Sequence, residues 1–368
     1  MILSENNMKR DLKILADLEE RLEKFLALAK NEIHSKPWLV VVLMHEYYRN
    51  LYPQDPYLPF DKKISNTSRI KSVLEKNIEI LKKTDYIKSY FPKITSLDNF
   101  VSEKLDNYKS KTKGKTQKVY DMLWKKFSTA NYLEEAKRII IDRFKNSKFN
   151  FPKLKGKTIL DLGCGSGRYT IALTLLTGAK KVYGIDLDRE SIKRCKKIVN
   201  KAGISNIEFK VADVLDIPFE DNFFDFIFCN GVLHHTLDMK KGMREFYRVL
   251  KPKSRAYLYL YGDGGIFWQT RKMAPKIMKK IPQEYTMAVL DIIGLPKSRF
   301  LFTDNWYVPL ERHTTRKYLE SYLKKIGFSA IEKIISGRPT DLDSVVALNH
   351  QDSKIIWGDG ELRYFVEK

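Results

Sequence analysis

Three glycines and one carboxylate in the middle of the chain are the residues best suited to hold a ligand. Gly163, Gly165 and Gly167 directly follow the apolar run Thr158–Leu162, which contains Asp161. Glycine permits positive φ angles and lets a ligand lie against bare main chain. An apolar run, a glycine-rich turn and a helix-like pattern together predict a strand, a ligand-binding loop and a helix N-terminus.

A second carboxylate and two histidines are further candidates for chemistry. Asp186 ends the apolar run Lys181–Ile185, roughly 20 residues beyond the glycines, where a carboxylate can accept hydrogen bonds from both hydroxyls of a ribose. His234 and His235 follow another apolar run and are candidate general bases for a hydroxyl or an amine. The alternative is that one of these histidines orders its loop through a hydrogen bond to the backbone.

The elements that must position these groups alternate between strand and helix from residue 156 onward. Strand-like runs cover Thr158–Leu162, Lys181–Ile185, Ile207–Val211, Phe224–Cys229 and Arg255–Tyr261. Helical patterns cover Tyr169–Thr177, Arg189–Ala202 and Lys240–Leu250. Because strands that alternate with helices pair in parallel, the pattern predicts a doubly wound α/β sheet.

The flanking segments complete the predicted organisation. A helix over Thr314–Ile326 is followed by strand-like runs over Phe328–Ile335 and Ser344–Asn349, which we expect to pair antiparallel because their connection is short. Further helical patterns cover 8–30, 37–49, 68–81, 119–126 and 132–145. We predict an N-terminal helical domain over 1–115, a sheet domain over 116–262 and 314–350, an insertion over 263–313, and a tail over 351–368.

Composition limits the classes of protein to which the chain can belong. Its 368 residues, 43% of them hydrophobic, are enough for two domains and argue against general disorder. The net charge of +22 favours an anionic partner such as nucleic acid, although dispersed lysines on a solvated surface explain it as well. The three cysteines lack metal-site spacing, and neither a signal sequence nor a membrane-spanning run is visible, so we expect a cytoplasmic protein without a metal site.

Four motifs in order resemble the class I S-adenosylmethionine-dependent methyltransferases, especially their ubiquinone-biosynthesis-like branch (methyltransferase type 11). The motifs are Leu160–Gly167, Val182–Asp188, Val211–Val214 and Phe224–His235. The run Glu245–Pro252 is similar to the helix and turn that follow in this family, although Lys253 stands where glycine is usual. The resemblance implies a Rossmann-like fold with a mostly parallel seven-stranded sheet and an antiparallel last strand.

The resemblance also implies S-adenosylmethionine as cofactor. Asp186 would bind its ribose, Asp213 its adenine amino group, and Asp161 its ammonium group, either directly or by ordering the loop. Asn230 and Gly231 would lie where the sulfonium and the methyl acceptor meet. The full predicted cofactor site is Asp161, Gly163, Cys164, Gly165, Gly167, Asp186, Leu187, Ala212, Asp213, Val214, Asn230 and Gly231.

The acceptor side is predicted from the insertion over 263–313, which is aromatic and basic. In the resembling family such insertions cover the acceptor, so we predict a lid with aromatic residues inside and basic residues at its rim. The alternative is a packing extension that holds the N-terminal helices. The candidate acceptor-binding residues are Tyr261, Trp268, Trp306, Arg312 and His313.

Together these observations predict an enzyme that transfers a methyl group to an oxygen, nitrogen or carbon atom of a small molecule in a covered pocket, with anionic molecules among the candidates. The Asn/Asp-Pro-Pro-aromatic signature of enzymes that methylate base amines is absent at Asn230, which argues against nucleic acid. Two alternatives stay open: an RNA or protein methyltransferase that docks through the basic N-terminal region, and a cofactor-binding partner without catalytic activity. The sequence leaves the acceptor and the oligomeric state undetermined.

Overall fold

The computed structural model describes the sheet region almost completely and other parts of the chain in pieces. The described residues are Met44, 129–145, 147–149, 151–278, 281, 283, 286, 304–308, 310–335, 341, 354 and 357–368. The helices expected before residue 129 and the strand expected over 344–349 lie outside them. Contacts divide the chain into one compact unit of 1–50, 64–105 and 274–307, and a second of 51–63, 106–273 and 308–368.

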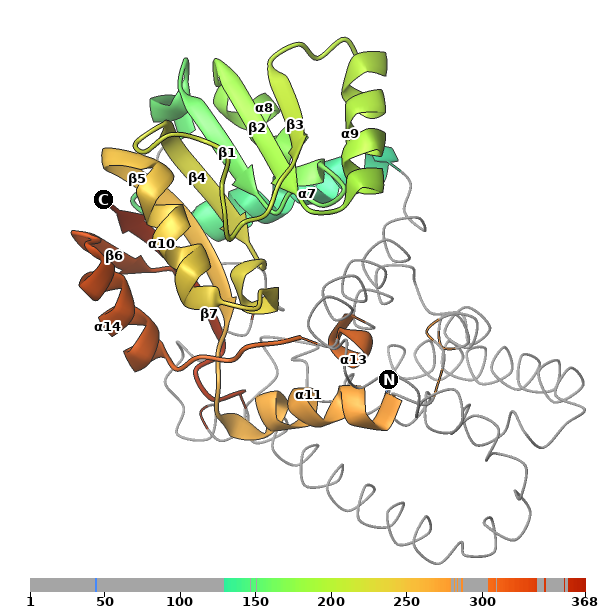
Figure 1. Cartoon of the computed structure of the whole chain (residues 1–368), viewed down its shortest axis with the longest axis vertical. Helices are drawn as coiled ribbons and strands as arrows, with labels where there is room; N and C mark the ends of the chain where they lie inside the picture. The colour runs from blue at the N-terminus through green and yellow to red at the C-terminus, as the bar shows by residue number, and fades with distance from the viewer. Residues whose placement is uncertain are drawn as a thin grey trace, which may run out of the picture. The chain divides into compact units, whose positions relative to one another are not determined.

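A seven-stranded sheet in the order β3-β2-β1-β4-β5-β7-β6 forms the centre of the second unit (Figure 1). The strands are β1 Thr158–Leu162, β2 Lys181–Asp186, β3 Ile207–Val211, β4 Phe224–Asn230, β5 Leu250–Tyr261, β6 Ala330–Lys333 and β7 Glu361–Glu367. Strands β1 to β5 pair in parallel, and β7 runs antiparallel to both β5 and β6. The predicted α/β fold with an antiparallel last strand is therefore confirmed.

The last strand lies further along the chain than the sequence pattern predicts. Residues 361–367 pair along β5, with Phe365 opposite Tyr257, and along β6, with Phe365 opposite Glu332. The prediction that residues 351–368 form a tail outside the sheet domain is therefore wrong, because residues 361–367 form one of its strands. The reason for the wrong prediction is Arg363, a charge in the middle of the run that is fully buried, because the carboxylates of Asp341 and of Glu361, two residues before it, neutralise it.

Helices cover both faces of the sheet, as a doubly wound fold requires (Figure 1). One face carries α7 Thr129–Phe144, α8 Arg168–Thr177 and α9 Arg189–Lys201, and the other carries α10 Met239–Val249 and α14 Arg316–Ile326. Leu160 and Leu162 of β1 pack toward α10 and α14 in the main apolar core. Asp188 caps α9 by accepting hydrogen bonds from the N–H groups of Glu190 and Ser191, the role that the sequence favours for it.

The tight turn at Lys253, within the first residues of β5, differs from the resembling family in sequence and keeps a backbone conformation that glycine favours. Lys253 has a φ of 60°, in the left-handed region that glycine adopts without cost. Its N–H donates to the carbonyl oxygen of Lys368 at 2.8 Å, which secures the turn against the end of β7. None of the helices that the structure describes is long and apolar enough to cross a membrane.

Candidate active site

The glycine loop between β1 and α8 packs against the end of β2. The N–H groups of Gly163 and Cys164 both donate to the carbonyl oxygen of Ile185 at 2.9 Å. Gly163, Gly165 and Gly167 have φ angles of 76°, 50° and 75°. Burial raises the pKa of the Cys164 thiol, which favours a packing role for this side chain. The loop therefore turns tightly at the carboxyl edge of the sheet.

Two of these glycines leave no room for a side chain. A Cβ at Gly163 would lie 2.5 Å from Cγ2 of Val232, in the loop after β4, and a Cβ at Gly167 would lie 2.8 Å from Sγ of Cys195. The loop after β1 therefore touches the loop after β4. The two loops share the edge at which open parallel sheets bind their ligands.

Asp186, at the end of β2, is held between the glycine loop and the turn before α9. Its Oδ2 accepts a hydrogen bond from the N–H of Gly165 at 2.9 Å, and its Oδ1 accepts one from the N–H of Asp188 at 3.0 Å. Burial raises the pKa of Asp186, and these two hydrogen bonds oppose that rise. A carboxylate has about four acceptor positions, more than the backbone N–H groups of the described residues occupy, so the group fits the paired hydroxyls of a ribose.

Asp161 lies buried beneath the glycine loop, with 2% of its surface exposed. Its Oδ2 accepts a hydrogen bond from Oγ1 of Thr170, in α8, at 2.6 Å. Burial raises the pKa of Asp161 to about 7; the Thr170 hydrogen bond opposes this rise, and the nearby charge of Asp186 adds to it. The contact with Thr170 favours the loop-ordering role for Asp161 over direct contact with a ligand.

Four more of the residues predicted to bind the cofactor lie in the turns after β2 and β3. The N–H of Ala212 donates to the carbonyl oxygen of Asp186 at 2.9 Å and so ties the two strand ends together. Oδ1 of Asp213 accepts a hydrogen bond from the N–H of Leu215 at 3.0 Å, which orders the turn after β3. The same two turns contain Leu187 and Val214.

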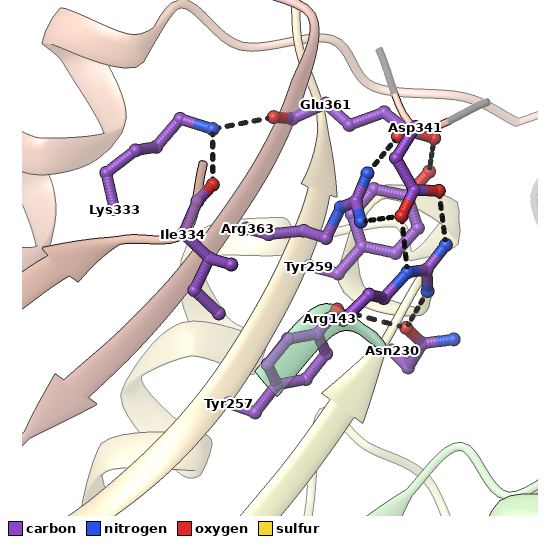
Figure 2. Close-up of polar contacts among 9 residues, drawn as sticks. All are labelled: Arg143, Asn230, Tyr257, Tyr259, Lys333, Ile334, Asp341, Glu361 and Arg363. Carbon is purple, nitrogen blue, oxygen red and sulfur yellow. Dashed lines mark hydrogen bonds and ion pairs between the residues drawn. The ribbon is translucent and has the colours of Figure 1, made fainter. Parts of the chain in front are cut away.

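A buried polar network holds Asn230, the last residue of β4 (Figure 2). Oδ1 of Asn230 accepts hydrogen bonds from Nη1 of Arg143, in α7, at 3.2 Å and from the hydroxyl of Tyr257, in β5, at 3.4 Å. Nε and Nη2 of Arg143 in turn donate to the two carboxylate oxygens of Asp341, both at 3.1 Å. Three segments that are far apart in the sequence thus fix the end of β4.

The same network continues into β7 and balances its own charges. Arg363 donates to the carboxylates of Asp341 and Glu361, and the hydroxyl of Tyr259 donates to Oε1 of Glu361 at 2.8 Å (Figure 2). Although burial opposes it, the charges of Arg143 and Arg363 hold the pKa of Asp341 well below its ordinary value. The sequence analysis did not predict this network. The one feature of the sequence that could have indicated it is Arg363, an arginine inside the apolar run of β7.

The two histidines lie in the short helix η3 (Leu233–His235), directly after the loop that follows β4. His234 is fully buried with its ring centre 3.6 Å from that of Tyr261, and neither ring nitrogen has a hydrogen-bond partner within the described part of the chain. Burial lowers its pKa well below the ordinary value. Nδ1 of His235 lies 3.0 Å from the carbonyl oxygen of Leu310, so Nδ1 carries the proton, and burial lowers the pKa of His235 to about 4.

Three of the predicted acceptor residues meet in one buried cluster at the end of β5. The guanidinium of Arg271 lies 3.9 Å from the ring centre of Tyr261 and bonds to Glu311 at 2.6 Å, and His313 contacts the same carboxylate at 3.1 Å. The ring of Trp268, in α11 (Gly265–Met278), lies 5.5 Å from that of Tyr261. Although burial opposes it, Arg271 and His313 lower the pKa of Glu311 to about 2.

The other two predicted acceptor residues are not part of this cluster. Arg312 has a different role, and Trp306 belongs to the other compact unit. Arg312 is exposed and donates to the carbonyl oxygens of Thr236 at 3.0 Å and Leu237 at 2.5 Å, so it secures the segment after η3. Trp306 lies in α13 (Asp304–Tyr307), which belongs to the first unit, and its side chain is buried. Its contact with an acceptor stays a prediction.

The carboxyl edge of the sheet therefore presents two kinds of surface. The ends of β1, β2 and β3 offer a bare peptide loop and the carboxylates of Asp186 and Asp213, which suit a nucleoside. At the ends of β4 and β5 lie the partly exposed Asn230 and His235, above the buried rings of His234 and Tyr261. The first surface matches the nucleoside site that the sequence resemblance implies, and an acceptor site at the second stays a prediction.

The sequence is similar to those of known methyltransferases. Residues 153–307 match a family model described as a methyltransferase domain. Demethylmenaquinone methyltransferase of Lactococcus lactis is 28% identical over 220 residues, which cover 59% of this chain and 83% of that protein. Norajmaline N-methyltransferase of Rauvolfia serpentina is 27% identical over 216 residues, covering 53% and 73%. Demethylmenaquinone methyltransferase of Geobacillus stearothermophilus is 34% identical over 99 residues, covering 27% and 42%.

Proposed function

We propose that this chain, which belongs to the class I S-adenosylmethionine-dependent methyltransferases, transfers a methyl group to a small-molecule acceptor. The family and its cofactor follow from the methyltransferase domain and the curated relatives. The observation that carries the proposal is Asp186, whose carboxylate lies against the glycine loop and has more acceptor positions than the backbone N–H groups of the described residues occupy. The names of the relatives specify different acceptors, so the small-molecule class is the level that they support.

Each part of the carboxyl edge has a proposed task. The peptide groups of the glycine loop would contact the amino-acid part of the cofactor, and Asp186 would accept from its ribose hydroxyls. Asp213 would accept from the adenine amino group, with its turn already ordered by Leu215. Asp161 would act through Thr170 by keeping α8 and the glycine loop in place.

The methyl transfer itself requires alignment more than acid–base chemistry. When bound, the cofactor supplies an electrophilic methyl group, and the chain must place an acceptor lone pair in line with it. The base predicted at His234 or His235 stays a prediction. Their lowered pKa values make both imidazoles weak proton acceptors, and the bond from His235 to Leu310 favours the loop-ordering alternative.

Calorimetric titration with S-adenosylmethionine tests the proposal, followed by transfer of a labelled methyl group to a panel of small molecules. Asp186→Ala should weaken cofactor binding roughly 100-fold, because two hydrogen bonds to a charged group are lost. Asp238→Ala is the matched control, since Asp238 also accepts a backbone N–H but caps α10. Binding of a nicotinamide cofactor in place of S-adenosylmethionine, or equal affinity in the two variants, would contradict the assignment.

RNA is the second candidate acceptor, and the net charge of +22 is the observation that favours it. Contacts to phosphates make such binding steeply dependent on salt concentration. RNA that copurifies at low salt, leaves at high salt and accepts the labelled methyl group would replace the small-molecule proposal. RNA that leaves without accepting the methyl group would show charge attraction alone.

A further inference from the structure

The side-chain amide of Asn230 can adopt one orientation only. Its Oδ1 faces two donors, the guanidinium of Arg143 at 3.2 Å and the hydroxyl of Tyr257 at 3.4 Å. A flipped amide would turn its NH2 group toward the guanidinium, which has donors and no acceptor. The oxygen of the amide therefore faces the network, and the nitrogen faces away from it (Figure 2).

The charges behind Arg143 keep this orientation fixed. Arg143 is bonded through two nitrogens to Asp341, and Arg363 bonds to both Asp341 and Glu361, so two cations face two anions around the buried Arg363 and Asp341. Moving Arg143 would leave a carboxylate uncompensated in a buried site, which is costly. Arg143 is thus a positioning residue, and its bond to Oδ1 also polarises the amide and strengthens the opposite N–H groups as donors.

The two N–H groups of Asn230 are available to a ligand. No acceptor within the described part of the chain takes a hydrogen bond from Nδ2, and Asn230 is partly exposed. The residue ends β4, and the loop that follows touches the glycine loop through Val232 and Gly163. The donor pair therefore lies at the edge where the methyl group and the acceptor are proposed to meet.

We propose that Asn230 selects an acceptor that presents an ionised hydroxyl, a phenolate or enolate oxygen, at the methylation site. The inference rests on the proposed function. An oxygen anion accepts a hydrogen bond from one of these N–H groups, whereas an ammonium or amine N–H faces another donor. The hydroxyl proton leaves to solvent on ionisation. The oxygen, or a carbon conjugated with it, then forms a bond to the methyl carbon while the sulfur–methyl bond breaks and leaves its electron pair on sulfur.

This assignment agrees with the two weakly basic histidines beside it. A phenol or enol that is bound as its anion needs no strong base in the site. The pKa of His235, lowered by burial to about 4, would make proton removal from a neutral hydroxyl unfavourable. Stabilisation of the anion by fixed donors supplies the same activation without a proton acceptor.

The test compares oxygen and nitrogen probes on enzyme saturated with S-adenosylhomocysteine. The probe pairs are catechol with phenylenediamine and naphthol with naphthylamine, measured by calorimetry. The oxygen probes should bind at least roughly 10-fold more tightly than the matched amines, and Asn230→Ala and Asn230→Asp should weaken them roughly 10- to 100-fold. Asn230→Asp should also reduce or reverse the preference for oxygen probes over amines, because it replaces the outward-facing NH2 donor with an oxygen.

Asn222→Asp is the matched control, in the turn that precedes the same strand. Asn222 is exposed, and its Oδ1 also accepts from a cationic side chain, Nζ of Lys368 at 2.8 Å. This variant should leave every probe affinity unchanged. Its φ of 58° is one that aspartate tolerates.

The outcomes separate this inference from the proposed function. If S-adenosylhomocysteine fails to bind the unmodified chain, the proposed function fails. If it binds and the amine probes bind as well as the oxygen probes, or no oxygen probe binds, the inference about Asn230 is overturned and the proposed function stands. The same conclusion follows if both Asn230 variants keep the affinity for S-adenosylhomocysteine and for the oxygen probes.

Discussion

The buried carboxyl group of Asp161 makes the stability of the sheet depend on pH in a direction unusual for an acid. Burial raises its pKa from 3.8 to about 7, so the folded protein holds this proton more tightly than the unfolded chain does. The free energy of unfolding should therefore fall as the pH rises from about 4 to about 7 and remain lower above that range. Asp161→Asn keeps the shape of the side chain and cannot ionise, so it should remove this slope.

The size of the effect follows from the two pKa values. Their difference of about 3 corresponds to at most about 4 kcal/mol, at about 1.4 kcal/mol for each unit of pKa. At pH 4 and below the variant and the unmodified chain should therefore differ little, and at pH 5 the difference should already be about 1.6 kcal/mol. At pH 8 the variant should be the more stable of the two by up to the full amount, because the buried charge is gone while its oxygen still accepts from Thr170.

Urea titrations followed by circular dichroism at pH 5, 6, 7 and 8 measure this difference. Asp225→Asn is the control, because Asp225 lies on the neighbouring strand but stays ionised. Although burial opposes it, the Thr158 N–H and Lys251 lower the pKa of Asp225. Asp225 is therefore ionised throughout this pH range, and Asp225→Asn should not change how the free energy of unfolding varies with pH above pH 5. Equal slopes for Asp161→Asn and the unmodified chain would refute the argument that the Asp161 carboxyl is protonated near neutrality.

Two further predictions concern the glycine loop and the network behind Asn230. Gly163→Ala should weaken S-adenosylmethionine binding and lower the melting temperature, because its Cβ would lie 2.5 Å from Val232. Gly156→Ala is the control: its φ is a similar 72° and its Cβ would have nothing within 4 Å, so this variant shows the cost of backbone strain alone, about 1 kcal/mol. Equal melting temperatures for the two variants would show that crowding at Val232 is unimportant. Arg143→Met should lower the free energy of unfolding by about 3–5 kcal/mol, since it removes one of the two cations that face Asp341. Adding Asp341→Leu should recover part of this loss in urea titration, because Arg363 keeps Glu361, and no recovery would show that the buried charge is not the cause.

The parts of the fold that the sequence predicts well are those governed by local pattern. The strands β1 to β4 and the helices between them match the predicted runs to within a residue or two, because each apolar run is bounded by a turn or a helix cap. The candidate cofactor residues sit at the ends of these strands for the same reason. Once the strands pair in parallel, Asp161, Asp186 and Asp213 must lie at or near one edge.

The parts that the sequence does not predict depend on partners that are distant along the chain. A run that contains Arg363 reads as an exposed tail until Asp341, which lies outside the run, is known to bond to its guanidinium. The bond from Arg143 to Asn230 joins α7 to β4 across 87 residues, and nothing in either local pattern indicates it. Buried charges follow the geometry of the folded chain, so hydrophobic periodicity carries no information about them.

The position of β7 also determines how the sheet is completed during synthesis. Tyr259 of β5 bonds to Glu361 of β7 across 102 residues of chain, so β5 has β4 beside it long before its second neighbour exists. During that interval the open side of β5 carries unpaired peptide groups next to Leu258 and Leu260, the combination through which nascent chains associate wrongly. The time taken to make and dock the intervening segment therefore sets how long a newly made chain is prone to aggregate.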